Sequence, residues 1–198
     1  MQGQNRSTNK SCGMLHVRRA MIQELIENDS LLVIAKGLGL FEVLSAFLLV
    51  YSQEDSRVLL INAPKAIQTR LERSLRAQNC RVPARSINTE FTKQERLDIY
   101  KQGGCICITS RILTVDLLDG SLLPRDISGI VVWGAHRLTE NCNEAFILRL
   151  FRQGNREGFI KALSDAPGLS STSPSTLLFS SSPLLLCLSI SLYIYICK

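Results

Sequence analysis

The stretch from Leu31 to Phe41, Leu-Leu-Val-Ile-Ala-Lys-Gly-Leu-Gly-Leu-Phe, carries the pattern that decides the fold of this 198-residue chain. Leu31 to Ala35 is a short apolar run, typical of a strand that is buried on both faces. Lys36 to Gly39 is a glycine-rich loop, and the apolar segment from Phe41 to Tyr51 is long enough for a buried helix. The order strand, glycine loop, helix predicts one unit of a parallel sheet with crossover helices.

The same alternation continues along the chain. Apolar runs at 58–61, 105–109, 129–133 and 159–164 predict further strands, and 80–87 gives a weaker strand pattern. Helical spacing recurs at 14–27, 65–78 and 143–152, and residues 92–101 predict a short helix or a turn. We therefore expect an α/β fold with a doubly wound parallel sheet, the RecA-like first lobe of a superfamily 2 helicase-type region. This domain is expected to span residues 14–168, after a polar, aperiodic and disordered lead-in at residues 1–13.

The composition changes abruptly after Gly168. Residues 169–198 are rich in serine and leucine, and Lys198 is their only charged residue. Within this tail the apolar run from Leu184 to Cys197 is shorter than the roughly 20 residues that a membrane-spanning helix needs. We therefore expect the tail to be read-through sequence and not part of the native domain, and we do not expect a membrane partner.

Charge and cysteine usage limit the classes of partner and site. The net charge of +6 favours an anionic partner such as nucleic acid, although a generic solvated surface has the same balance. The seven cysteines are irregularly spaced and form no Cys-x-x-Cys pair. Cys105 and Cys107 lie on one face of a predicted strand, which indicates core packing and not a metal site. Unpaired cysteines indicate a reducing compartment.

The glycine loop resembles a nucleotide-binding loop that lacks its chemistry. Such a loop needs a Lys for the outer phosphates and a Ser or Thr for Mg²⁺. When Gly37 and Gly39 are aligned with the last glycines of such a loop, Leu40 takes the Lys position and Phe41 the hydroxyl position. We therefore interpret the loop as a strand-to-helix turn that does not bind nucleotide tightly.

A second degenerate motif follows the predicted strand at 129–133. Active helicases carry Asp-Glu-Ala-His or a similar sequence there, because the Asp holds Mg²⁺ and the Glu activates the attacking water. Here Trp133 and Gly134 occupy the two acidic positions, and only Ala135 and His136 remain. Two failed motifs in the right order support each other and predict a domain without ATPase activity.

Basic residues supply the candidate contacts to nucleic acid. Ser110 and Arg111 follow a predicted strand, where they could contact phosphates or simply start a helix. Arg149, Arg152 and Arg156 are spaced i, i+3, i+7 and would share one helix face if the helix continues through Gly154. Such a stripe suits a phosphate backbone or an acidic protein, whereas plain surface solubility is the alternative. Lys161 is expected nearby.

Five segments of the chain carry a family resemblance: Gly103-Gly104, Thr109 to Leu113, Ala135-His136-Arg137, Glu144 to Gln153 (Glu-Ala-Phe-Ile-Leu-Arg-Leu-Phe-Arg-Gln) and Gly158 to Ala162. They resemble the XPF family, whose members are large subunits of a nucleotide-excision-repair endonuclease. The resemblance runs from about Met14 to Asp165. It implies a nuclear protein with a helicase-like N-terminal region whose ATPase motifs are inactive, and it makes Arg137 a candidate contact to DNA.

The resemblance also implies partners: branched or damaged DNA, repair scaffold proteins, and a smaller subunit that binds through a C-terminal region missing here. The nuclease domain of such relatives, which would use Mg²⁺ or Mn²⁺, has no counterpart in this chain, so we expect no cofactor. The segment Glu95-Arg96-Leu97-Asp98 looks faintly like the nuclease motif but lacks its Lys and its spacing. An interaction module that does not bind DNA and a residual ATPase or helicase are the alternative functions.

Overall fold

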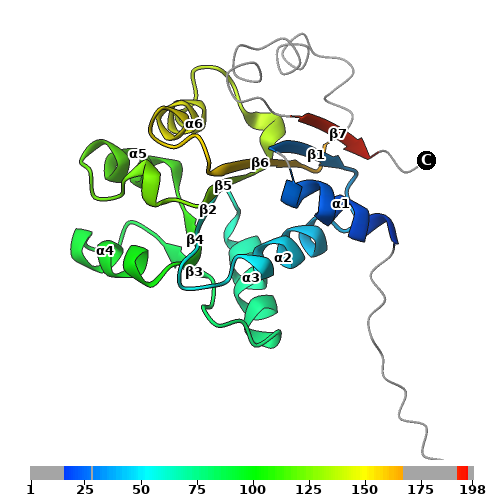
Figure 1. Ribbon diagram of the computed structural model, residues 1–198, viewed down its shortest axis with the longest axis horizontal. Helices are drawn as coiled ribbons and strands as arrows, with labels where there is room; N and C mark the ends of the chain where they lie inside the picture. Colours follow the sequence, from blue (N-terminus) through cyan, green and yellow to red (C-terminus); the bar gives the residue numbers. More distant parts are fainter. Residues whose placement is uncertain (1–15, 28, 167–190, 196–198) are drawn as a thin grey trace, which may run out of the picture.

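A computed structural model of the chain describes residues 16–27, 29–166 and 191–195. Its centre is a sheet of parallel strands in the order β3-β4-β2-β5-β6-β1-β7 (Figure 1). The strands are β1 (Ser30–Ile34), β2 (Arg57–Ile61), β3 (Arg85–Ile87), β4 (Gly104–Ile108), β5 (Gly129–Trp133), β6 (Phe159–Ser164) and β7 (Ser191–Tyr195). The doubly wound α/β fold expected from the sequence is confirmed.

Helices cover both faces of the sheet. One face carries α1 (His16–Glu27), α2 (Leu40–Val50) and α3 (Lys65–Ala77), and the other carries α4 (Lys93–Gln102), α5 (Ser110–Leu118) and α6 (Asn143–Gly154) (Figure 1). Two short 3₁₀ turns, η1 (Pro124–Asp126) and η2 (Ala135–Arg137), flank β5. The helices explain why the central strands read as unbroken apolar runs, since each strand is buried on both sides.

Alternation along each strand divides the core into two layers. On β2, Val58 and Leu60 pack under α1, α2 and α3, whereas Leu59 and Ile61 pack under α4, α5 and α6. Cys105 and Cys107 of β4 are fully buried in the first layer, so their predicted role in core packing is confirmed.

The predicted elements match the observed ones with few differences. The strand expected at 80–87 is reduced to β3, because Pro83 has no N–H to donate to a ladder and the chain becomes extended only after it. The helix expected at 143–152 is α6, which continues to Gly154. The predicted lead-in at residues 1–13 lies outside the described residues.

Most of the expected tail also lies outside the described residues, except for β7. This strand pairs in parallel with β1, from Ser30 beside Ser191 to Ile34 beside Tyr195 (Figure 1). The β-branched and aromatic residues of Ser-Leu-Tyr-Ile-Tyr favour a strand. No helix in the described ranges is long and apolar enough to cross a bilayer.

A buried ionic cluster joins α4 to α5. Asp116 is fully buried and accepts two hydrogen bonds from the Arg96 guanidinium, at 2.9 and 2.7 Å. It also accepts a hydrogen bond of 2.6 Å from the Tyr100 hydroxyl. Burial, together with this bond, raises the pKa of Tyr100 well above its usual range. Each polar group of the cluster depends on the others, because Asp116 and Tyr100 are buried and the Arg96 side chain is only 15% exposed.

We predict that Asp116→Ala destabilises the fold by about 3–5 kcal/mol, because it leaves the Arg96 charge buried without its counter-ion. Urea unfolding followed by circular dichroism measures the change. Asp119→Ala is the matched control, since Asp119 pairs with Lys93 at 3.0 Å on the surface and should cost less than about 1 kcal/mol. Equal losses in the two variants would show that the buried cluster contributes no more than the surface pair.

Candidate nucleic-acid interface at the carboxyl edge of the sheet

The carboxyl ends of the strands gather the candidate functional residues. Because all strands are parallel, the loops after β1, β2, β4 and β5 open at the same edge of the sheet. Ligands of doubly wound folds bind outside this edge. The loops, and the helical turns that begin directly after them, carry the glycines at 37 and 39, the serine at 110 and the arginines at 111 and 137. The fold therefore brings together residues that are as far as 100 positions apart in the sequence.

The loop after β1 holds two glycines in the left-handed backbone conformation and leads directly into α2. Gly37 and Gly39 have φ angles of 86° and 92°, which favour glycine, and Gly39 caps α2. The next two side chains, Leu40 and Phe41, are only 7% and 8% exposed and belong to the core. The two positions that a nucleotide site needs for its Lys and its hydroxyl therefore hold buried apolar groups.

Two arginines from other elements pack against this loop and against the first turn of α2. The Arg18 guanidinium, from α1, lies 2.7–2.8 Å from where a Cβ on Gly39 would be. Arg70, from α3, places its Cζ 3.9 Å from the centre of the Phe41 ring and pairs with Glu42 at 2.9 Å. Sequence reasoning did not find Arg18, because nothing in the helical pattern of α1 shows that it reaches the glycine loop.

The residues in and beside the loop after β5 are neutral or basic. Trp133 and Ala135 are buried, and Gly134 between them has a φ of 68°. Arg137 folds back so that its Nη2 lies 2.5 Å from where a Cβ on Gly134 would be. Any side chain at position 134 would strain the backbone, and its Cβ would overlap the Arg137 guanidinium.

His136 points instead toward the end of β6. Its Nδ1 lies 3.0 Å from the Ser164 hydroxyl and 3.8 Å from an Asp165 carboxylate oxygen. Both neighbours approach the same ring nitrogen, which is not the arrangement of a nucleophilic triad. The His therefore ties the loop after β5 to the end of β6.

The loop after β4 gives Ser110 a structural role. Thr109 caps α5 and Ser110 is its first residue, as in the helix-start interpretation, while Arg111 is exposed beside it. Burial raises the pKa of the Glu144 carboxyl, but hydrogen bonds from its own backbone and from the side chains of Cys142, Ser110 and Asn62 lower it by more in total. The net shift of the pKa is therefore downward. Ser110 therefore faces a carboxylate of α6, and Arg111 is the more exposed of the two residues.

The prediction that Arg149, Arg152 and Arg156 share one face of α6 is wrong. The helix ends at Gly154, so Arg156 lies beyond it. Arg152 is ion-paired with Asp29, and its side chain is 14% exposed. Lys161 is 1% exposed within β6, so it does not present its ammonium group on the surface.

The two remaining arginines of the stripe separate to opposite edges of the sheet. Arg149 is exposed and donates to the Glu140 carbonyl in the loop that precedes α6, near the carboxyl edge. Arg156 is also exposed, but it lines a hollow at the amino ends of β2, β5 and β6 together with Arg125. One phosphate chain that follows the carboxyl edge would meet Arg149 and not Arg156.

The segment that looks faintly like a nuclease motif is structural. Glu95 forms a capping box with Thr92 at the start of α4, and Arg96 binds Asp116. Among the residues that the structure describes, no group of three His, Cys, Asp or Glu side chains could hold a metal ion.

Comparison with known proteins assigns the chain to a family. It is 41% identical over 152 residues to the protein named DNA repair endonuclease XPF of Mus musculus and 39% identical over 158 residues to that of Drosophila melanogaster. The matches cover 77% and 80% of this chain. The chain belongs to the XPF family. It spans only 17% and 16% of the length of those two relatives. No family model matches it.

Solved structures support the helicase-type lobe of this XPF-family chain. The helicase domain of Pyrococcus furiosus Hef superposes with a TM-score of 0.69 at 20% identity, over 90% of this chain and 37% of that one. A hypothetical ATP-dependent RNA helicase from Sulfolobus tokodaii superposes with a TM-score of 0.64 at 9% identity, over 90% of this chain and 52% of that one. At these identities the similarity concerns the fold alone.

The buried Lys161 should make the free energy of unfolding of this XPF-family lobe depend on pH. Burial lowers its pKa from 10.5 to about 8. Between these two pH values the unfolded chain binds more protons than the folded chain, so the free energy of unfolding should rise with pH across this window. We expect the wild type to gain stability relative to Lys161→Met from about pH 8 to pH 10.5 in urea titrations. A difference that stays constant over this window would contradict the burial of a charged ammonium.

Proposed function

We propose that this chain is a DNA-binding, helicase-like part of an XPF-type repair endonuclease subunit, and that it acts without ATP. The observation that carries the proposal is the composition of the carboxyl edge. Exposed basic groups at 36, 111, 137 and 149 surround it, while Leu40 and Phe41 fill the nucleotide positions. Because the names of its relatives describe DNA repair endonucleases, we propose DNA as the anion that these groups bind.

Phosphate contacts explain this arrangement better than base contacts. The exposed basic side chains follow the ends of different strands, and neighbouring parallel strands lie about 4.8 Å apart. Such a row can follow a sugar–phosphate backbone, which requires positive charge but no base sequence. We therefore propose recognition of DNA shape, such as branched or damaged DNA and junctions between single and double strands, in nucleotide-excision repair.

The rest of the proposal follows from family membership. We propose a nuclear protein that works beside repair scaffold proteins. A smaller partner subunit and a nuclease domain that uses Mg²⁺ or Mn²⁺ belong to the full-length relatives, and we assign neither function to this chain. We propose no cofactor for the lobe itself.

A splayed-arm DNA duplex tests the proposed interface. We predict that Arg111→Ala combined with Arg137→Ala weakens binding about tenfold or more at low salt. The slope of log K against log salt should fall by about 2, which is about one for each lost phosphate contact. Fluorescence anisotropy at several salt concentrations measures both quantities.

The opposite edge provides the matched control for this experiment. Arg125→Ala combined with Arg156→Ala removes the same charge from the amino edge, and we expect it to leave the salt slope unchanged. An equal loss in both double variants would mean that only net charge matters, and the assignment to the carboxyl edge would be rejected.

ATP turnover tests the second half of the proposal. We predict that the chain releases no phosphate from Mg-ATP above background, with or without DNA, because neither motif supplies a Lys, a hydroxyl or a carboxylate to the nucleotide. A colorimetric phosphate assay is sufficient. Release that DNA stimulates would overturn the inactive-lobe proposal while leaving the DNA-binding proposal intact.

A further inference from the structure

Helix α5 exposes mainly apolar side chains to solvent. Its exposed residues are Arg111, Val115 and Leu118, which are spaced i, i+4 and i+7 and therefore share one face of the helix. Val115 is 56% exposed and Leu118 is 63% exposed. Single exposed apolar side chains are common on protein surfaces, but apolar residues that dominate one exposed helix face indicate an interaction surface.

The neighbouring helix α6 continues this apolar face. The two helices pack side by side on the same face of the sheet (Figure 1), and a hydrogen bond of Ser110 to Glu144 aligns their amino ends. Phe146 of α6 is 43% exposed, and Leu150 follows it by one turn and is partly buried. At a rise of about 1.5 Å per residue, the apolar residues of both helices extend over about 10 Å, or two turns. We call this set the α5–α6 patch: Val115, Leu118, Phe146 and Leu150.

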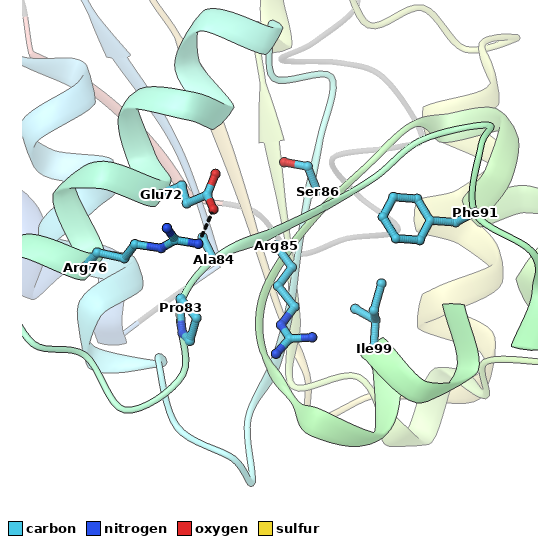
Figure 2. Close-up of a pocket in the computed structure, with 8 residues that line it drawn as sticks. All are labelled: Glu72, Arg76, Pro83, Ala84, Arg85, Ser86, Phe91 and Ile99. Carbon is cyan, nitrogen blue, oxygen red and sulfur yellow. Dashed lines mark hydrogen bonds and ion pairs between the residues drawn. The ribbon is translucent and has the colours of Figure 1, made fainter. Parts of the chain in front are cut away.

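The outer faces of α3 and α4 are different. On α3, Glu72 and Arg76 form a surface ion pair of 2.7 Å (Figure 2). On α4, which covers the same face of the sheet as α5, every exposed residue is polar. Within the described ranges Lys65–Ala77 and Lys93–Gln102, no large apolar side chain is exposed. The α5–α6 patch is therefore a local feature and not a general property of the helices of this lobe.

Each of the two helices places one arginine beside its exposed apolar residues. On α5, Arg111 precedes Val115 by one turn, and on α6, Arg149 follows Phe146 by three residues. In the described part of the chain, neither arginine has an ion-pair partner within 4.0 Å. Arg149 donates to the Glu140 carbonyl, which carries no compensating charge. The α5–α6 patch therefore has a positive rim.

The acidic residues of these helices do not offset the two arginines at the surface. Asp116 is buried, and Glu144 is partly buried beside Ser110, so the described ranges of α5 and α6 expose no acidic residue. Directly after α5, Asp119 is already paired with Lys93 at 3.0 Å. A second copy of the chain on the patch would therefore bring like charges together, and DNA would leave the apolar side chains uncovered. The complement of the patch is an apolar surface that carries acidic side chains.

We propose that the α5–α6 patch is a docking site for an amphipathic helix of a partner protein, whose acidic residues meet Arg111 and Arg149. The occupant is a helix because the main-chain groups of α5 and α6 bond within their own helices, so an extended chain finds no ladder to join. The side-chain ridges of two adjacent helices leave a groove into which the ridge of a third helix packs. The two turns of the patch match apolar anchors at i, i+3, i+4 and i+7 of the occupant.

A fluorescent helical peptide with leucine at i, i+3, i+4 and i+7 and glutamate at its other positions is the probe, and the full 198-residue chain is the receptor. We expect saturable binding in fluorescence anisotropy. Val115→Gln combined with Leu118→Gln should weaken it about tenfold, because apolar contact is lost without a change in charge. Val50→Gln is the matched control, since Val50 is 48% exposed at the end of α2 on the other face of the sheet. Unchanged binding in the double variant, or equal losses in both variants, would overturn the proposal. Circular dichroism verifies that each variant is folded.

A second pair of variants tests the acidic character of the partner. Arg111→Gln combined with Arg149→Gln should weaken binding of the glutamate peptide about threefold at low salt, as expected for exposed charge pairs. A peptide with the same leucines and with lysine in place of glutamate should bind the wild type more weakly than the glutamate peptide does. Equal binding of the two peptides would reject an acidic partner.

Two further measurements separate the patch from other uses of the same surface. Sedimentation that reveals a dimer of the chain, lost in the Val115→Gln and Leu118→Gln variant, would assign the patch to a second copy and overturn the proposal. The same variant should bind the splayed-arm duplex as the wild type does, because the proposed DNA contacts are the basic side chains at the loop ends. Loss of DNA binding in this variant would make the patch part of the DNA interface and not a separate docking site.

Discussion

The fold depends on a parallel sheet that is buried on both faces. Val58 to Ile61 in β2 and Ile130 to Val132 in β5 are completely buried, so neither face of these strands has room for a polar functional group. Polar chemistry is therefore restricted to the two ends of the strands and to the lateral edges of the sheet. Since the strands are parallel, the two ends differ, and the carboxyl end collects every loop that precedes a crossover helix.

This constraint also explains how the lobe folds with apolar side chains at the positions where a nucleotide-binding loop would carry its Lys and its hydroxyl. The glycines at 37 and 39 serve the turn from β1 into α2, and that turn is needed whether or not a phosphate binds. The side chains of Leu40 and Phe41, which follow this turn, pack in the hydrophobic core. Burying each such apolar side chain stabilises the fold by about 1.5–3 kcal/mol. Packing thus gives these two side chains a structural role that does not depend on a bound nucleotide.

The order of the strands, and of the helices except α5, could be predicted because burial on both faces leaves an unmistakable apolar run in the strands, as at 31–35 and 129–133. The glycine positions and the substituted motif positions could also be located, since they depend on local order along the chain. The basic stripe could not be predicted correctly. The spacing of Arg149, Arg152 and Arg156 is local, but their positions depend on where α6 ends and on Asp29, which lies 123 residues before Arg152.

Lys161 and Arg18 are two further side chains whose positions could not be predicted from the sequence. Lys161 looks like a surface charge in the sequence, yet β6 is enclosed between β5 and β1, so it is buried. Arg18 looks like one more polar residue of an amphipathic helix, yet packing of α1 beside α2 brings it to Gly39. In both cases a long-range pairing decides the role of the side chain, and no local periodicity encodes that pairing.

The two ends of the strands differ in what they can offer an anion. The carboxyl edge is built from loop ends, and its exposed basic groups at 36, 111, 137 and 149 suit the proposed polyanion, which needs no fixed backbone pairing. The amino edge also carries basic groups, at 125 and 156, but they line a hollow together with Asp55 and Asp126. A basic net charge alone would attract DNA to both edges, so the proposed interface depends on how the loop ends place their charges and not on the net charge.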